Sequence, residues 1–171
     1  MIIESIDSRN DLYSVSNIID DRLIQDIPKE DFLSYDFENF ENHEDRPRRL
    51  IKLHKQSVLA KINIDLFTKL PMISKMVGIQ FKTIKTVYWL DLPGYKLEPH
   101  LDDDRVNCAM QIYLWGDDVG TTFYEDNTLK VRKAFNFVPN TGYIMKQNAD
   151  QLHGVDSTVT KPRLSCYSWL D

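Results

Sequence analysis

The sequence of 171 residues has little of what builds disulfide scaffolds, flexible linkers or membrane anchors. Its two cysteines, Cys108 and Cys166, allow at most one disulfide bridge and lack the close spacing of a metal site. No apolar run approaches the ~18 to 20 residues of a membrane span, and the first residues lack the basic and apolar regions of a secretory signal. We therefore expect a soluble cytoplasmic protein without membrane contacts, whose two thiols are reduced and buried in strands.

Positive charge is also scarce, because 21 Lys and Arg residues face 26 Asp and Glu residues and give a net charge of −5. This balance argues against an electrostatic footprint for nucleic acid across the chain, so we expect no nucleic-acid partner. One basic run, residues 46–55, departs from the balance. Runs of charge usually mark solvated surface, and we expect this run to form a solvated strand and the start of a helix.

Internal repeats, low-complexity tracts and Gly/Ser-rich linkers are absent as well, which predicts a single domain over residues 1–171. In residues 1–79 the apolar side chains mostly follow helical spacing. The pattern predicts one helix over residues 17–27 and a second over residues 56–70, with a shorter segment after Pro71. We expect this first part to be a mainly helical support region.

From residue 80 the spacing of apolar residues drops towards two, in short runs rich in Val, Ile, Thr, Tyr and Phe that turn residues separate. The runs predict strands over residues 80–92, 97–103, 107–115, 120–125, 128–135, 135–139, 142–147, 152–155 and 163–170. Short strands in series after a helical part are typical of an antiparallel sandwich or barrel. We therefore expect a mainly β fold, in which residues 80–171 form the barrel and helices back it.

Two histidines and an aspartate in this strand-rich half have the side chains and spacing for a metal site. His100 and Asp102 stand two positions apart, so on a strand both side chains point to one face, and His153 follows later in the chain. Two imidazoles and one carboxylate leave neighbouring coordination positions open, which suits non-heme Fe(II) oxygenases. A second His-x-Asp pair, His43 and Asp45, lies in a polar stretch without strand alternation, and we expect it in a solvated loop.

The order of features around these residues is more specific than any one of them. A Pro-Gly turn comes first, followed by the His-x-Asp pair, segments 120–124 and 139–143, His153, and the Lys-Pro-Arg-Leu-Ser segment 161–165. This ordered series resembles the core of the iron- and 2-oxoglutarate-dependent dioxygenases, including their prolyl-hydroxylase-like branch. The resemblance covers about residues 80–171 and implies a double-stranded β-helix, which is a jelly-roll or cupin-like barrel.

The resemblance implies that His100, Asp102 and His153 bind Fe(II). It also implies that Arg163 binds the distal carboxylate of the cosubstrate 2-oxoglutarate. A guanidinium suits that role because its planar fork forms two parallel hydrogen bonds with a carboxylate. Ser165 lies on the same strand face as Arg163 and is expected to add a hydroxyl donor. The three metal ligands and Arg163 are the predicted catalytic residues.

A second contact to the cosubstrate is expected from Tyr113, which matches a tyrosine that some prolyl-hydroxylase-like members use to bind the same carboxylate. Alternation supports an inward direction for Gln111 and Tyr113, because the apolar residues beside and between them take the buried outer face. Gln111 and Trp115 are candidates for the wall of the cavity. The cosubstrate is thus expected to meet one charged and several polar side chains.

The resemblance implies a hydroxylase that uses Fe(II), 2-oxoglutarate and O2 and releases succinate and carbon dioxide. Its substrate is expected to be a peptide that is hydroxylated on proline, or a free amino acid or other small molecule. Asp102 stands where the related halogenases carry a small residue, and Trp169 stands where the nucleic-acid demethylases carry a second arginine. Both departures argue against those activities.

Two other interpretations are open at this point. One is a catalytically silent β-barrel that only binds a ligand, although such a protein needs neither the three metal ligands nor Arg163. The other is a metal-dependent cupin-type enzyme that does not use 2-oxoglutarate and therefore does not need Arg163. No motif before residue 80 predicts the substrate, and no feature of the sequence predicts the oligomeric state.

Overall fold

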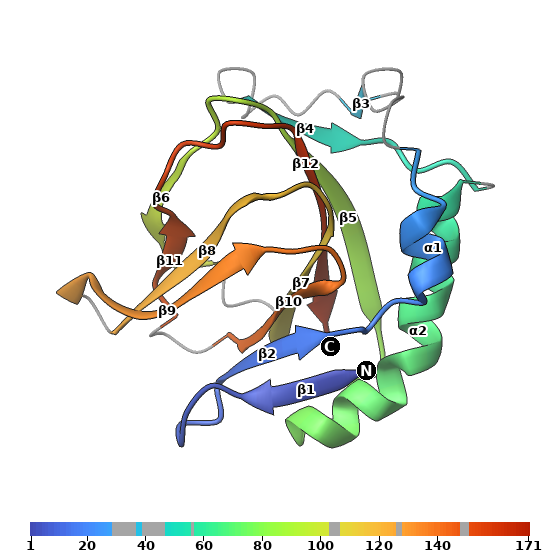
Figure 1. The fold of residues 1–171 in the computed structure, drawn as a ribbon. Helices are drawn as coiled ribbons and strands as arrows, with labels where there is room; N and C mark the ends of the chain where they lie inside the picture. The colour runs from blue at the N-terminus through green and yellow to red at the C-terminus, as the bar shows by residue number, and fades with distance from the viewer. Residues whose placement is uncertain (29–36, 39–46, 56, 103–106, 126–127, 148–150) are drawn as a thin grey trace.

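The computed structural model describes residues 1–28, 37–38, 47–55, 57–102, 107–125, 128–147 and 151–171 (Figure 1). The N-terminal elements are β1 (Ile2–Ser5), β2 (Leu12–Ser16), α1 (Asp21–Gln25), β3 (Phe37–Glu38), β4 (Arg48–Ile51) and the long helix α2 (Val58–Val77). The elements after it are β5 (Ile84–Asp91), β6 (Leu97–His100), β7 (Cys108–Trp115), β8 (Asp118–Glu125), β9 (Lys130–Phe137), β10 (Thr141–Lys146), β11 (His153–Val155) and β12 (Arg163–Leu170). Strands therefore make up the C-terminal half, as its periodicity predicts.

The strands form two antiparallel sheets that face each other (Figure 1). The larger sheet has eight strands in the order β1-β2-β10-β7-β12-β5-β4-β3, and the smaller sheet has four in the order β6-β11-β8-β9. Strands that are distant in sequence become neighbours, because β12 pairs with both β5 and β7. This jelly-roll arrangement confirms the predicted mainly β, double-stranded β-helix fold.

Helix α2 covers the outer face of the larger sheet, on the side away from the smaller sheet (Figure 1). Its buried side chains, among them Ile62, Leu66 and Ile73, form one core with Met110 and Ile112 of β7. They recur at helical spacing, so a single apolar stripe of the helix faces the sheet. Within the described ranges, no helix is long and apolar enough to cross a membrane.

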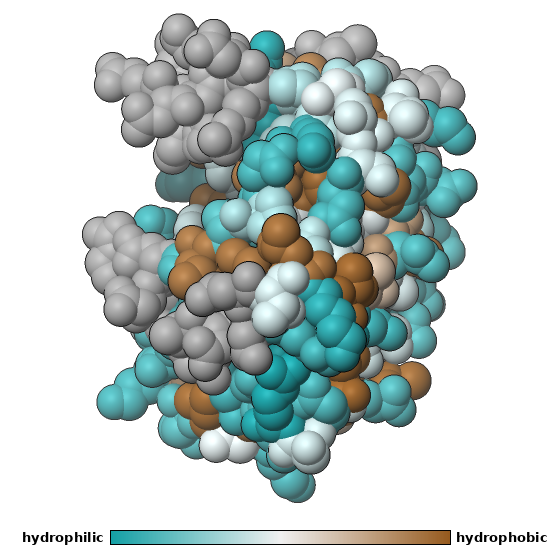
Figure 2. All heavy atoms as spheres, turned by 90° about the vertical axis from the view of Figure 1, so that its left-hand side faces the viewer, coloured by the Kyte–Doolittle hydropathy of each residue, from teal (hydrophilic) through white to brown (hydrophobic). Residues whose placement is uncertain are grey.

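The side of the molecule that carries the smaller sheet mixes polar and apolar groups. Figure 2 shows apolar side chains across the middle of this face, between polar ones. Three residues on or next to strands of the smaller sheet, Leu101, Leu129 and Val131, keep 50%, 58% and 53% of their surface exposed. The main hydrophobic core therefore lies on the other side, between the larger sheet and α2.

Residues at both ends of α2 match the capping rules. The Ser57 hydroxyl accepts a hydrogen bond from the N–H of Ala60 at 3.3 Å, and Gly78 ends the helix in the left-handed conformation at φ 75°. The expected end of the helix before Pro71 is wrong, because Pro71 lies inside one continuous helix. Proline removes one hydrogen bond, but buried apolar residues on both sides of it keep the stripe on the sheet, so packing outweighs that loss.

The N-terminal part is less helical than its periodicity predicts. Helix α1 covers only Asp21–Gln25 of the predicted helix 17–27, and the strands β1 to β4 precede α2. These strands extend the larger sheet at both ends, because β2 pairs with β10 and β4 pairs with β5. They have two to five residues each, too few for a period of two to stand out. In the C-terminal part, the expected pieces 128–135 and 135–139 form the single strand β9.

Both cysteines lie on strands of the larger sheet, Cys108 on β7 and Cys166 on β12. Both are free and fully buried, as predicted. Burial raises the pKa of each thiol to about 12. The thiolate form is therefore rare at neutral pH, and solvent does not reach it.

We expect neither thiol to react with a colorimetric disulfide reagent in the folded protein at pH 8, because the reagent attacks only accessible thiolates. After denaturation in urea, both thiols of each chain should react. The measurement is the absorbance of the released chromophore with and without urea. Rapid reaction of either thiol in the folded protein would contradict the buried positions of Cys108 and Cys166.

A buried arginine joins the β1–β2 hairpin to the smaller sheet. The side chain of Arg132 on β9 is 3% exposed, and it forms ion pairs with Asp7 and Asp11. It also donates a hydrogen bond to Oε1 of Gln151 at 3.3 Å. Two carboxylates thus share one buried guanidinium, and of the two Asp11 is the more buried, with a side chain that is 11% exposed against 33% for Asp7. An unpaired charge on Asp11 or Arg132 would be costly.

Replacing this arginine, as in Arg132→Met, should lower the free energy of unfolding by about 3–5 kcal/mol, because Asp7 and Asp11 lose their shared partner. The matched control is Arg9→Met, since Arg9 also contacts Asp7 but has a side chain that is 39% exposed. The control should change the free energy by less than about 1 kcal/mol. Urea unfolding followed by tryptophan fluorescence measures both, and equal losses would contradict a buried role for Arg132.

Candidate metal centre and cosubstrate cavity

His100 and His153 lie opposite each other on neighbouring strands of the smaller sheet. β6 ends at His100, β11 begins at His153, and the antiparallel register pairs the two residues directly. Their ring centroids are 4.6 Å apart. Gly154 lets the strands approach, because a Cβ atom there would lie 2.7 Å from the backbone oxygen of Leu97 on β6. The backbone pairing therefore places the two imidazoles side by side.

Asp102 completes a cluster of three metal-binding side chains. Its Oδ1 lies 3.3 Å from Nε2 of His100 and 3.7 Å from Nε2 of His153. The three ligand atoms all lie within 4.8 Å of one another. A transition metal bound at ~2.0–2.2 Å from each atom fits such a triangle. The structure thus brings the three predicted ligands together, and the donor set fits Fe(II) with open coordination positions.

A backbone carbonyl holds the other nitrogen of each imidazole. Nδ1 of His100 lies 3.0 Å from the carbonyl oxygen of Glu98, and Nδ1 of His153 lies 2.8 Å from that of Gln151. A proton on Nδ1 satisfies each carbonyl and leaves Nε2 facing the cluster, where it must give up any proton of its own to bind a metal. Metal-binding histidines almost always have such an outer hydrogen bond. Both rings are therefore oriented for a metal by the protein itself.

Tyr167 holds the second oxygen of the carboxylate, because its hydroxyl donates a hydrogen bond to Oδ2 of Asp102. Burial alone would raise the pKa of Asp102, but hydrogen bonds from His100 and Tyr167 and the charge of His153 outweigh it and lower the pKa to about 2. The hydrogen bond with Asp102 raises the pKa of His100, whereas burial lowers the pKa of His153. At neutral pH Asp102 is therefore a carboxylate, as a metal ligand must be.

Arg163 lies in the wall of the same cavity as the three ligands, and this cavity has a volume of about 270 Å³. Arg163 is the first residue of β12, and its side chain is 3% exposed. Its Nε donates to Oδ2 of Asp91 at 3.0 Å, its Nη1 donates to the carbonyl oxygen of Val119, and its guanidinium stacks on Phe137 at 4.7 Å. Among the described residues its Nη2 has no hydrogen-bond partner, so one donor remains for a ligand.

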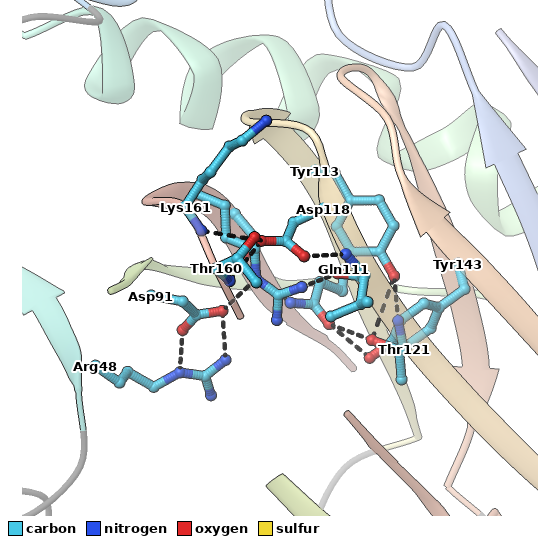
Figure 3. A network of polar contacts seen from close by, with 12 residues as sticks. Arg48, Asp91, Gln111, Tyr113, Asp118, Thr121, Tyr143, Thr160 and Lys161 are labelled. Atoms are coloured by element: carbon cyan, nitrogen blue, oxygen red, sulfur yellow. Dashed lines mark hydrogen bonds and ion pairs between the residues drawn. The ribbon is translucent and has the colours of Figure 1, made fainter. Parts of the chain in front are cut away.

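The segment before Arg163 is anchored by Asp118, the first residue of β8 (Figure 3). Oδ2 of Asp118 accepts hydrogen bonds from the N–H of Thr160 at 2.7 Å and of Lys161 at 3.0 Å. Gly116, at φ 121°, makes room for this approach, because a Cβ atom there would lie 2.7 Å from Cβ of Arg163. The anchored segment thus fixes where β12 begins and where Arg163 lies.

Gln111 lines the cavity and joins three hydroxyl groups (Figure 3). Its Nε2 donates to Oγ of Ser165 at 3.0 Å, and its Oε1 accepts from the Tyr143 hydroxyl at 2.7 Å and from the Thr121 hydroxyl at 3.4 Å. The Tyr113 hydroxyl donates to Oγ1 of Thr121 at 3.2 Å and accepts from the Thr121 N–H at 3.1 Å. Tyr113 and Ser165 therefore point inward as predicted, but they bind neighbours and lie behind the residues that form the wall.

The alternation predicted for β7 holds in the structure. Every second residue from Met110 to Leu114 belongs to the core under α2, whereas Gln111 and Tyr113 point to the opposite face. Trp115, at the end of the strand, does not line the metal cavity and packs partly against the core under α2 instead. Of the two predicted wall residues, the structure places only Gln111 in the cavity.

Arg48 belongs to the cavity wall, although it is part of the basic run that the sequence predicts as solvated surface. It lies on β4, its side chain is only 15% exposed, and it forms an ion pair with Asp91. The expectation of a solvated run is therefore wrong for this residue. No local pattern could indicate its position, because its partner stands 43 residues away in the sequence.

Tyr167 is a second functional candidate that sequence reasoning missed, and here a signal was available. It stands two positions after Ser165 and four after Arg163 on β12, so alternation places all three on one face.

The second His-x-Asp pair of the sequence, His43 and Asp45, lies outside the described residues.

Among the comparisons with known proteins, the one with solved structures gives matches, and these show the fold. No family model matches the sequence, and no curated protein matches it. A prolyl hydroxylase from Trichoplax adhaerens, solved with a peptide fragment of the hypoxia inducible factor oxygen degradation domain, is similar with a TM-score of 0.68 at 10% identity, over 94% of this chain and 83% of the other. A prolyl-4-hydroxylase from Pseudomonas putida is similar with a TM-score of 0.67 at 14% identity, over 93% of this chain and 91% of the other.

The viral collagen prolyl hydroxylase of Paramecium Bursaria Chlorella virus-1 has a TM-score of 0.61 at 11% identity, over 93% of this chain and 94% of the other. This chain has the fold of the prolyl hydroxylases. At these low identities the similarity shows the fold alone, because proteins that share a fold can differ in their chemistry.

Removing either imidazole, as in His100→Ala or His153→Ala, should weaken Fe(II) binding by more than the ~10- to 100-fold that loss of an outer partner costs. Calorimetric titration under nitrogen measures the affinity, and Co(II) absorption reports the ligand set. The control is His54→Ala, since His54 is exposed and lies outside the cavity wall. Unchanged Fe(II) binding in either cavity variant would contradict the assigned ligands.

Fe(II) binding by the wild type should also weaken as the pH falls through the raised pKa of His100. The reason is that a protonated imidazole cannot bind a metal.

Proposed function

We propose that the protein is an Fe(II)- and 2-oxoglutarate-dependent oxygenase that hydroxylates a peptidyl, proline-like substrate or an amino acid and releases succinate and carbon dioxide. The observation that carries the proposal is the presence of the His-Asp-His cluster and the buried Arg163 in one cavity. Metal ligands alone fit many enzymes, and a buried arginine alone fits many ion pairs. Together they suit a cosubstrate that has a metal-binding end and a distal carboxylate.

Fe(II) would be held by His100, Asp102 and His153. With 2-oxoglutarate and O2 it supplies, when bound, the oxidising chemistry that a protein side chain cannot supply. Arg163 binds the distal carboxylate through its remaining nitrogen, in a charge-assisted hydrogen bond. Asp91 keeps this guanidinium in a fixed direction, so little reorganisation accompanies binding.

The polar network around Gln111 shapes the remaining wall of the cosubstrate site. Ser165 holds the amide of Gln111, and Tyr113 holds the hydroxyl of Thr121. We propose a supporting role for Ser165 and Tyr113, in which they fix the two wall residues that contact the cosubstrate. Stacking of Tyr113 on Phe137, with centroids 4.3 Å apart, restrains the tyrosine ring in turn.

Two classes of substrate are consistent with this site. One of the similar structures is a prolyl hydroxylase in complex with a peptide fragment, which supports a peptide. A free amino acid fits the same chemistry, because the site acts on one C–H bond and does not require a chain on either side of it. The aromatic side chains of Trp89 and Trp169 belong to the wall and offer apolar contact to either class.

Succinate formation tests the proposal. Wild-type protein with Fe(II), ascorbate and 2-oxoglutarate in air should form succinate. Arg163→Met should raise the KM for 2-oxoglutarate about 10- to 100-fold, because it removes a hydrogen bond between charged groups worth ~1.5–3 kcal/mol, and should leave Fe(II) binding unchanged. Lys161→Met, two positions earlier and exposed, is the matched control and should behave as wild type.

The same assay separates the two alternative functions. Tight Fe(II) binding without succinate under any condition would favour a catalytically silent binding protein. Turnover that does not depend on 2-oxoglutarate, and that Arg163→Met leaves unchanged, would favour a cupin-type enzyme. Either result would contradict the proposed function.

A further inference from the structure

A single buried carboxylate, Asp91 at the end of β5, binds two arginines. Its Oδ1 accepts from Nε of Arg48 at 2.5 Å, and its Oδ2 accepts from Nη2 of Arg48 at 3.2 Å and from Nε of Arg163 at 3.0 Å. The side chains of Asp91 and Arg163 are 1% and 3% exposed, whereas that of Arg48 is 15% exposed. Arg48 thus has the most exposed side chain of these three residues.

The guanidinium of Arg48 is held in place and has one unused nitrogen. It lies over the ring of Tyr95 at 4.0 Å and 5.2 Å from the ring centroid of Trp89. Nη1 points away from Asp91 (Figure 3) and has no hydrogen-bond partner in the part of the chain that the structure describes. The cavity wall therefore presents a second permanently charged donor besides Arg163.

Arg48 lines the same cavity as the three metal ligands His100, Asp102 and His153. A group bound to Arg48 would therefore lie near the metal ligands, where the carbon to be oxidised must be placed.

We propose that Arg48 binds the carboxylate of the substrate and that the substrate is a free amino acid rather than a residue inside a peptide. The inference rests on the proposed function and selects one of its two substrate classes. A carboxylate forms a charge-assisted hydrogen bond with a guanidinium, which is stronger than the bond that a neutral peptide carbonyl offers. A residue inside a peptide has no main-chain carboxylate for Arg48.

The charges in the cavity favour a molecule without net charge. Asp91 neutralises one of the two guanidinium groups, and the distal carboxylate of 2-oxoglutarate neutralises the other. The two charges of Fe(II) would be balanced by Asp102 and by the other carboxylate of 2-oxoglutarate. A substrate with net negative charge would bring an uncompensated charge into a buried site, which is costly. A free amino acid is a zwitterion, so it gives Arg48 a carboxylate and adds no net charge.

The size of the cavity admits a free amino acid. Sites for drug-sized ligands have volumes of about 300–1,000 Å³. This cavity has about 270 Å³ and must also hold the cosubstrate. The remaining space suits a small molecule.

Calorimetry under nitrogen tests the inference without turnover. The Fe(II)- and 2-oxoglutarate-loaded wild type is titrated with each of the twenty standard amino acids, with their carboxamides and with their N-acetyl derivatives. At least one free amino acid should bind, and its carboxamide and N-acetyl forms should bind at least about tenfold more weakly, since each loses the carboxylate or the zwitterion. Absence of any binding, or equal affinity for the free acid and either derivative, would overturn the inference.

Variants assign the effect to Arg48. Arg48→Gln should weaken binding of the free amino acid at least about tenfold, leave its carboxamide unchanged, and keep the affinity for 2-oxoglutarate within about twofold. Arg49→Gln is the matched control, because the next residue of β4 points to the opposite face, and it should bind as wild type. Weaker 2-oxoglutarate binding in Arg48→Gln would show that Arg48 serves the cosubstrate and would overturn the inference. If Arg48→Gln does not fold, the comparison of acid and carboxamide on the wild type decides.

Succinate formation, measured on the same samples, separates the two proposals. A preference for the free acid that depends on Arg48, without any succinate, supports the carboxylate site and contradicts the oxygenase. Succinate formation without a preference for the free acid supports the oxygenase and contradicts the carboxylate site.

Discussion

The hydrogen bonds between β6 and β11 set the distance between the two imidazoles, and the other parts of the site are arranged around that pair. His100 and His153 are direct partners in the antiparallel register, and such partners hold their Cβ atoms ~4.5–5.5 Å apart. Residues that are far apart in sequence therefore meet through backbone pairing. Gly154 allows the close approach of the strands, and the carbonyls of Glu98 and Gln151 then orient the rings.

The larger sheet uses its two faces for different purposes. On β12, Leu164 and Cys166 belong to the core under α2, whereas Arg163, Ser165 and Tyr167 face the smaller sheet and take part in the site. Alternate residues of the same strand thus belong to the core and to the candidate site. The site gains rigidity from this arrangement, because its side chains project from a backbone that the core on the other face already holds.

The parts that could be predicted from the sequence are those with a local signal. Period two and turn residues predict the C-terminal strands, and the order of motifs predicts which side chains converge with Arg163. The N-terminal strands are short, and distant partners in β5 and β10 decide their pairing. At Pro71, the packing of α2 on the larger sheet outweighs the tendency of proline to end a helix. Arg48 shows the same limit within the site, because a charge in a basic run looks like surface unless its buried partner Asp91 is known.

Asp91 accepts hydrogen bonds from two arginines, so the loss of either one leaves its charge matched by the other. The usual penalty for removing one member of a buried ion pair is therefore reduced at Arg48. A substitution at position 48 therefore disturbs this cluster less than the loss of one member of an isolated ion pair would, while Arg163 keeps its partners Asp91 and Val119. Under the roles proposed for the two arginines, a mutation could thus alter the choice of substrate and leave the choice of cosubstrate as it is.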